Sequence, residues 1–207
     1  MMDEGRRVVL GGGREVVLED EDDILLSVIS DGETKFTFSV PYPEGGYGGG
    51  MLFLSESEQY LVFSYFSGQS EEAFLLFRID GCNLEPIYHS EYCYGEDGNY
   101  YFSREEDFLV QTLRTGWWSW FEEEAQTDSE GNPCYEFGLI QILDITKREL
   151  SRHVIHVYPS GDWEEETDVG PFQISEIIND NTINITMPWG EEKFTFPFGD
   201  VIVVKPK

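Results

Sequence analysis

The sequence has very little positive charge. Its 207 residues include 13 Lys and Arg against 41 Asp and Glu, which leaves a formal net charge of −28. Proteins bind nucleic acids by neutralising phosphates with Lys and Arg, and anionic membranes attract the same residues. We therefore expect neither a nucleic acid nor a membrane as partner. A surface of this charge instead attracts a basic protein and raises its rate of encounter.

Long apolar runs and cysteines are also scarce. We find no apolar stretch long enough to span a bilayer as a helix and no pattern of a signal peptide, so we expect a cytoplasmic protein. The three cysteines, Cys82, Cys93 and Cys134, form an odd set without a CxxC spacing. This pattern favours reduced thiols over a disulfide framework.

The overall composition is that of a folded domain. Hydrophobic residues make up 40% of the chain and aromatic residues 15%, which argues against disorder despite the net charge. A chain of this size buries about 70% of the surface that its unfolded form exposes. We expect a single domain over residues 1–207 that folds without disulfides or a cofactor.

The hydrophobic pattern predicts an all-β fold. Apolar or alternating runs of about five to eight residues recur between Gly, Pro, Asn, Asp and Ser clusters, and no run keeps a helical period. Sixteen strands are predicted, at residues 6–10, 15–18, 24–29, 35–40, 51–54, 60–66, 73–79, 86–89, 100–103, 108–113, 135–144, 151–157, 172–176, 182–187, 192–196 and 201–204.

Internal similarity suggests a repeated unit. The segments Gly32–Phe38 and Gly190–Phe196 differ at a single position and lie about 158 residues apart. The segments Phe53–Val62 and Phe102–Val110 form a second echo, offset by about 48 residues. Both offsets are near multiples of a unit of about 50 residues, a period typical of propeller blades.

The order of these patterns resembles the blades of WD-repeat and related β-propellers. Leu139–Leu150 reads as the third strand, turn and fourth strand of a blade, and Phe74–Asp80 followed by Leu84 is a weaker copy. The WD dipeptide and the Gly-His pair are missing at the corresponding positions. The resemblance implies about four propeller-like, four-stranded antiparallel blades and no particular substrate. A β-sandwich produces a similar alternation and is the alternative fold.

The residues that carry catalysis are thinly represented. His153 and His156 are three positions apart in a predicted strand, so they point to opposite faces and do not converge on one metal ion. We expect His89 to be a structural histidine, and no cysteine has a histidine at a recognisable catalytic spacing. Pairs of carboxylates occur by chance in so acidic a chain. We therefore expect a protein without enzymatic activity, metal or cofactor.

The most distinctive local feature is a pair of segments in which tryptophan precedes an acidic run. Both read Trp, three Glu, then Thr-Asp. Tryptophan buries a large area and stacks on Arg or Lys, while glutamates pair with the cationic charge. The alternative is that the rings fill the core and the glutamates solvate a turn. The predicted partner-binding residues are Trp117, Trp118, Trp120, Glu122, Glu123, Glu124, Trp163, Glu164, Glu165 and Glu166.

These observations favour an acidic binding protein that neutralises a basic partner, most specifically an inhibitor or immunity protein for a toxin. Three other hypotheses stay open. The chain is a carbohydrate-binding or glycoside-processing module that stacks sugars on tryptophan, or a DNA mimic that competes for a basic protein. The third hypothesis is a self-assembling protein that forms homo-oligomers through strand edges. The acidity is also compatible with a saline habitat.

Overall fold

The structure is a computed structural model of the chain. It describes residues 6–20, 24–41, 49–67, 71–114, 126–127, 130–131, 133–157, 173–179, 182–187, 190–195 and 201–204. The described residues form eighteen strands and one 3-10 turn, and none of their helical segments is long and apolar enough to cross a membrane. The chain divides into two compact units, Met1–Tyr94 and Gly95–Lys207.

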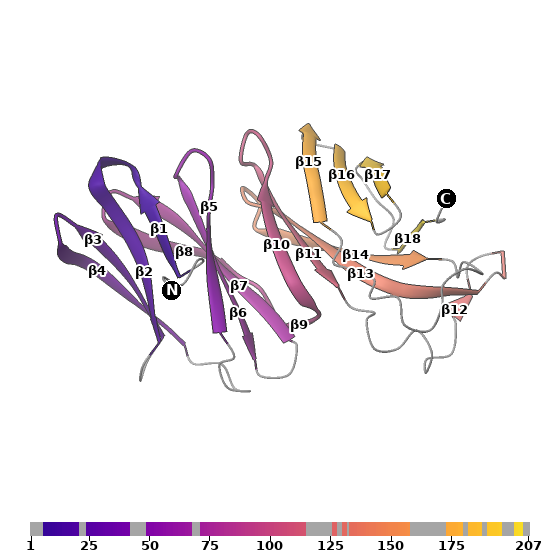
Figure 1. Ribbon diagram of the computed structural model, residues 1–207, viewed down its shortest axis with the longest axis horizontal. Coiled ribbons are helices and arrows are strands. Elements are labelled where there is room, and N and C mark those ends of the chain that lie inside the picture. Colours follow the sequence, from indigo (N-terminus) through magenta and orange to yellow (C-terminus); the bar gives the residue numbers. More distant parts are fainter. Residues whose placement is uncertain are drawn as a thin grey trace. The chain divides into compact units, whose positions relative to one another are not determined.

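The first unit begins with sheet 1, a four-stranded antiparallel meander whose strands follow one another in chain order (Figure 1). Its strands are β1 (Arg7–Leu10), β2 (Arg14–Asp20), β3 (Ile24–Ser30) and β4 (Glu33–Val40). The turn between β3 and β4 is Asp31-Gly32, with φ of 54° and 75°. Positive φ at both central residues matches the twist of the flanking strands, and Asp-Gly adopts it readily.

Sheet 2 completes the first unit and repeats the same order. Its strands are β5 (Gly49–Leu54), β6 (Tyr60–Ser67), β7 (Glu71–Asp80) and β8 (Asn83–His89), with the short strand β9 (Cys93–Tyr94) also paired to β7. Both faces of its central strands are buried, as the runs of buried residues in β6 and β7 show. A strand buried on both faces reads as a continuous apolar run.

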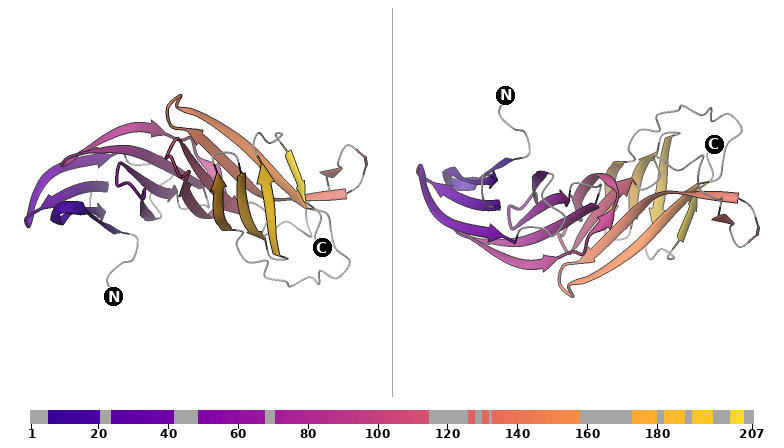
Figure 2. Two further views of the ribbon diagram at one scale, coloured as in Figure 1. Left: turned by 90° about the horizontal axis from the view of Figure 1, so that it is seen from above. Right: turned by 90° about the horizontal axis from the view of Figure 1, so that it is seen from below.

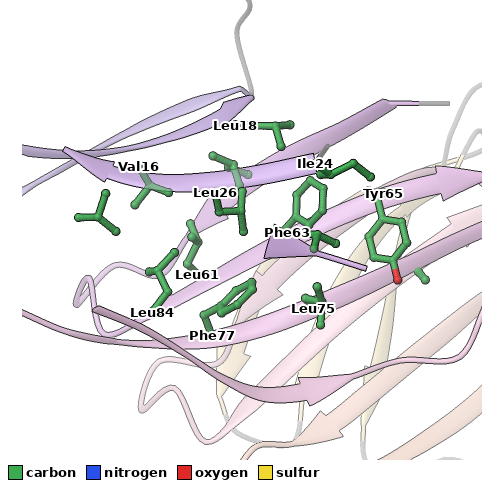
Figure 3. Packing of buried hydrophobic residues seen from close by; sticks show 14 of the residues in the cluster. Val16, Leu18, Ile24, Leu26, Leu61, Phe63, Tyr65, Leu75, Phe77 and Leu84 are labelled. Carbon is green, nitrogen blue, oxygen red and sulfur yellow. The ribbon is translucent and has the colours of Figure 1, made fainter. Parts of the chain in front are cut away.

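Sheets 1 and 2 pack face to face over one apolar core. Val16 and Leu26 extend from sheet 1 toward Leu61, Phe63 and Phe77 of sheet 2 (Figure 3). The alternation of side chains along each strand produces this layer, because every second residue faces the same side. Phe38 of β4 adds an edge-to-face contact with Phe77, at a centroid distance of 5.0 Å.

The second unit contains sheet 3, built on the same meander. Its strands in order are β10 (Glu96–Phe102), β11 (Phe108–Arg114), β13 (Pro133–Asp144) and β14 (Glu149–Val157). The two-residue strand β12 (Gln126–Thr127) pairs with the start of β13. Strand β18 (Val201–Val204) adds to the outer edge of β14 in parallel orientation, beside the long β13–β14 hairpin (Figure 2).

Sheet 4 completes the second unit with three antiparallel strands. They are β15 (Gln173–Asn179), β16 (Thr182–Met187) and β17 (Gly190–Thr195). Its first strand, β15, lies against β10, the first strand of sheet 3. In the first unit β1 lies against β5 in the same way. Successive sheets within each unit therefore align first strand to first strand.

Each of sheets 1, 2 and 3 has two distinct ends. At the turn end the first strand leads to the second and the third to the fourth, through short turns such as 11–13, 81–82 and 145–148. At the connection end the second strand leads to the third and the fourth leaves the sheet. The segments that leave β4, β11 and β14 start from the connection end. This asymmetry follows from the meander order and is the same in the three sheets.

The predicted fold class is confirmed. All sixteen predicted strands are present within a few residues of their predicted bounds, and β9 and β12 are additional. The consecutive order of strands gives propeller-like blades and differs from the crossed order of a Greek-key sandwich. The predicted third strand, turn and fourth strand at Leu139–Leu150 are β13 and β14 of sheet 3, and Phe74–Asp80 lies in β7, the third strand of sheet 2. The single domain over residues 1–207 stays a prediction.

Candidate functional site

The ten predicted partner-binding residues lie outside the described residues, so their role stays a prediction. They are Trp117, Trp118, Trp120, Glu122, Glu123, Glu124, Trp163, Glu164, Glu165 and Glu166. The described strands on either side of them nevertheless limit where their segments begin.

Both Trp-acid segments start from the connection end of sheet 3. The first follows Arg114, the last residue of β11, and the second follows Val157, the last residue of β14. Strand β13 lies between these strands, and its Gly138 is the ladder partner of both Arg114 and Ile155. The meander thus brings the starting points of two segments that are distant in sequence to one end of one sheet.

A second group of aromatic and acidic residues lies within the described residues, at the connection end of sheet 2. It centres on Tyr65 of β6, whose hydroxyl oxygen lies 2.5 Å from Nε2 of His89, the last residue of β8. Tyr65 stacks on Phe63 at 5.4 Å between ring centroids, at the margin of the apolar core (Figure 3). Burial raises the pKa of Tyr65 well above its ordinary value and lowers the pKa of His89. Both groups are therefore neutral at pH 7.

Tyr92 joins this group from the segment after β8. Its ring meets Tyr65 edge to face, with centroids 5.9 Å apart and an interplanar angle of 83°. Burial raises the pKa of Tyr92, and the negative charge of Glu71 raises it further, while a hydrogen bond with Tyr65 opposes the shift. The Glu71 carboxylate is thus close enough to Tyr92 for its charge to matter.

Strand β9 places a third tyrosine beside the same carboxylate. Tyr94 is the direct ladder partner of Glu71, and directly opposed residues in antiparallel strands hold their Cβ atoms about 5 Å apart on one face. Tyr94 is 59% exposed and Tyr92 is 36% exposed. Few other large hydrophobic side chains among the described residues are as exposed. We call Tyr65, Glu71, His89, Tyr92 and Tyr94 the tyrosine cluster.

The sequence did not predict this cluster. His89 was expected to be a structural histidine, and its ring nitrogen lies 2.5 Å from the Tyr65 hydroxyl. Nothing was expected of the following Glu91, Tyr92 and Tyr94. The available signal was the sequence His-Ser-Glu-Tyr-Cys-Tyr, which sets aromatic rings beside a carboxylate as the Trp-acid segments do. Glu71 had no signal, because its place depends on the pairing of β9 with β7.

The other histidines and cysteines form no chemical centre among the described residues. His153 and His156 are both buried in β14, and Nε2 of His153 lies 3.0 Å from the Ser151 hydroxyl. No group of three or more His, Cys, Asp or Glu in the described part of the chain is arranged to hold a metal ion. Cys82 and Cys93 are not joined in a disulfide.

A row of polar side chains crosses sheet 3 from β10 to β14. Gln111 donates from Nε2 to the Tyr100 hydroxyl at 2.7 Å, and Gln141 donates to Gln111 Oε1 at 2.9 Å. Arg152 then donates to Gln141 Oε1 at 3.2 Å. Gln111 and Gln141 are 2% and 1% exposed, so the bonds compensate for their lost hydration. This row specifies the register of four strands and is structural.

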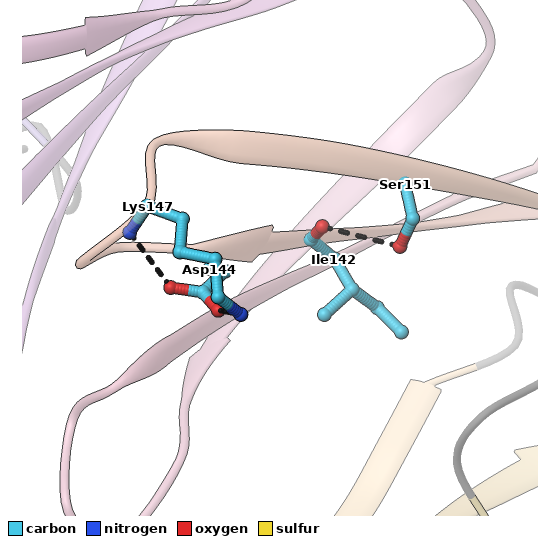
Figure 4. Close-up of polar contacts among 4 residues, drawn as sticks. All are labelled: Ile142, Asp144, Lys147 and Ser151. Atoms are coloured by element: carbon cyan, nitrogen blue, oxygen red, sulfur yellow. Dashed lines mark hydrogen bonds and ion pairs between the residues drawn. The ribbon is translucent and has the colours of Figure 1, made fainter.

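Two cationic side chains near the turn ends of sheets 2 and 3 pair with carboxylates. Arg78 pairs with Glu85 at 2.5 Å in sheet 2, and Lys147 pairs with Asp144 at 2.6 Å in sheet 3 (Figure 4). The Lys147 side chain and backbone amide both bond to Asp144, which holds the pKa of that carboxyl below its ordinary value. Both pairs lie near the turn ends of their sheets.

Comparison with known proteins adds only distant structural likenesses. No family model matches the sequence, and no curated protein matches it. The chain is similar to the WD40 domain of SCAP from fission yeast, with a TM-score of 0.42 and 9% identity over 90% of this chain and 46% of that one. It is also similar to a mutant of the Synechocystis apocarotenoid oxygenase, with a TM-score of 0.38 and 8% identity over 93% and 49%. The chain spans about half the length of both structures.

Proposed function

We propose that the chain is a non-enzymatic binding protein that engages a basic protein through aromatic and acidic residues at the connection ends of its sheets. The observation that carries this proposal is the topology of sheet 3. The two Trp-acid segments start after Arg114 and after Val157. These are the last residues of β11 and β14, the two strands that flank β13. Two segments of the same unusual composition therefore start at one end of one sheet.

The distribution of charge supports the same surface. The net charge of −28 calls for an explanation, because like charges on one surface repel one another and lower the stability of the fold. Binding of a basic partner and adaptation to a saline habitat are two such explanations. Arg14, Arg78, Arg104, Lys147 and Arg148 lie at or beside turn ends, whereas Arg7 and Arg114 lie at connection ends. The segments 117–124 and 163–168 themselves contain six glutamates and one aspartate and no Lys or Arg, so a basic partner would supply the missing positive charge there.

The most specific form of the proposal is a cytoplasmic inhibitor or immunity protein for a basic toxin. Opposite charge accelerates the encounter of two proteins, and rapid capture is what an inhibitor of a toxic enzyme needs. In this form Trp118, Trp120 and Trp163 are the anchors. The glutamates at 122–124 and 164–166 then cover the partner's cationic surface.

The first test is capture of partners from a lysate of the native host at low salt, followed by mass spectrometry and a series of salt washes. We expect one basic protein, released as ionic strength rises. The recovered protein is then used to measure association rates with the triple variant Glu164→Gln, Glu165→Gln, Glu166→Gln. A matched control, Asp31→Asn, Glu56→Gln, Glu105→Gln, removes three exposed charges at turn ends.

The proposal predicts that the 164–166 variant slows association by tenfold or more, on the order of the effect of steering charges at an interface, while the control changes it about twofold. Equal slowing by both variants contradicts a located surface, and recovery of no basic protein contradicts the proposal as a whole. Binding that survives about 1 M salt, where the Debye length is about 3 Å, points to a glycan or other stacking ligand instead.

A further inference from the structure

We propose that Glu71, Tyr92 and Tyr94 form a receptor for one arginine side chain of the basic partner. This inference rests on the proposed function and assigns it a second contact point, in the first unit of the chain. All three residues lie at the connection end of sheet 2 and belong to the described residues.

The geometry sets two rings beside one carboxylate. Tyr94 faces Glu71 directly across the β7–β9 ladder. Tyr92 packs edge to face on Tyr65 two residues before Tyr94, close enough to Glu71 for that charge to raise its pKa. Both rings are substantially exposed, and Glu71 is exposed as well. A guanidinium is planar, stacks on aromatic faces and bonds to a carboxylate through a fixed fork of donors, so it uses both kinds of group at once.

Tyr65 and His89 act as positioning residues for this receptor. Tyr65 is 2% exposed and is held by its stacking on Phe63 and its hydrogen bond to His89. Tyr92 packs edge to face on this fixed ring. A preorganised ring loses less conformational entropy on binding than a free one, which strengthens a contact of given area.

The negative charge of the chain favours a positively charged ligand. A net charge of −28 repels anionic ligands, and exposed tyrosine rings with an adjacent carboxylate favour a cation over a neutral apolar side chain. Arginine is preferred to lysine because the ammonium of lysine is a compact, strongly hydrated charge that stacks poorly.

The test measures binding of a fluorescein-labelled peptide, acetyl-(Arg-Gly)4-amide, to the full chain by fluorescence anisotropy, beside the corresponding lysine peptide. The variants are Glu71→Gln, Tyr94→Ala and Tyr94→Phe, and Glu56→Gln is the matched control. Glu56 is an exposed carboxylate in the turn between β5 and β6 of the same sheet, so both Glu variants lose one charge. Thermal unfolding of each variant establishes that it is folded.

We expect Glu71→Gln and Tyr94→Ala each to weaken binding of the arginine peptide about fivefold, and Tyr94→Phe to keep it within about twofold, because phenylalanine retains the ring. Glu56→Gln is expected to change it less than twofold, since exposed charges at a distance are screened. The wild-type preference for arginine over lysine is expected to disappear in Tyr94→Ala.

Equal effects of Glu71→Gln and Glu56→Gln, with no effect of Tyr94→Ala, overturn the receptor. If the 164–166 charge variant still weakens binding of the arginine peptide in that case, the proposed function stands and only this contact point fails. If the wild-type chain binds neither peptide at low salt, the proposed function itself fails.

Discussion

Ser55 and Ser103 close two turns with the same set of hydrogen bonds. Each hydroxyl accepts a bond from the amide five residues ahead, at 3.1 Å from Tyr60 and at 3.1 Å from Phe108. Each serine amide donates to the carbonyl of that same residue, and each serine carbonyl accepts from an amide three residues ahead. The repeat seen in the sequence is therefore a repeat of the turn between the first and second strands of a blade.

These serines are predicted to matter for stability. Both are buried, and Ser→Ala removes an acceptor and leaves a buried amide with one bond fewer. We expect Ser55→Ala and Ser103→Ala each to lower the free energy of unfolding by about 1 to 2 kcal/mol, measured by urea denaturation. Ser39→Ala, at an exposed position in β4, is the control and is expected to change it by less than about 0.5 kcal/mol. Equal effects at all three positions would show that the turn bonds contribute nothing.

The polar row across sheet 3 predicts non-additive substitutions. Gln141→Leu removes the donor to Gln111 Oε1 and the acceptor for Arg152 in a buried site, so we expect a loss of about 2 to 3 kcal/mol in stability. The double variant Gln111→Leu, Gln141→Leu removes both amides and is expected to cost less than the sum of the single variants. A double-mutant cycle by urea denaturation measures the coupling. Strict additivity would mean that the two amides do not act together.

The pair formed by Tyr65 and His89 predicts a pH dependence of stability. Burial lowers the pKa of His89 in the folded protein, so the unfolded chain binds a proton more readily. The stability that neutral His89 contributes is present above the unfolded pKa of about 6.5 and is lost as the pH falls through it toward the folded pKa. We expect thermal stability to fall in this range relative to the His89→Gln variant. Parallel curves for the two proteins would contradict the prediction.

The ion pair in the β13–β14 turn predicts that the stability of the protein depends on the ionisation of Asp144 at acid pH. Asp144 accepts from the Lys147 amide at 2.9 Å and from its ammonium, and its pKa is lowered. The resulting stability is present above the unfolded pKa of about 3.9 and is lost as the pH falls through the lower folded pKa. We expect Asp144→Ala to destabilise by less than about 1 kcal/mol at pH 7, because its partner Lys147 is exposed and solvent screens the pair. The difference from wild type should shrink at pH 2.5. Lys147→Met, which keeps the amide bond, serves as control.

The sequence predicted strands well and their partners poorly. The pattern of apolar residues along Leu139–Asp144 is a local property of the chain. Strand β13 could therefore be predicted from residues that are neighbours in sequence. Strand β9 has two residues and no periodicity, and its existence depends on a free edge of β7 at Glu71 and Glu72. The place of Glu71 in the tyrosine cluster was therefore not predictable, because it requires that pairing.

The sequence by itself determined the net charge of −28, the all-β class and the repeated turn at Ser55 and Ser103, since each depends on composition or on local spacing. The tertiary structure decided which residues meet. Tyr65 and His89 belong to different strands, and only the register of β6, β7 and β8 brings the phenol to 2.5 Å from the imidazole. Register is set by burial of whole faces against a second sheet, and a slip of one residue would turn these side chains to the opposite face.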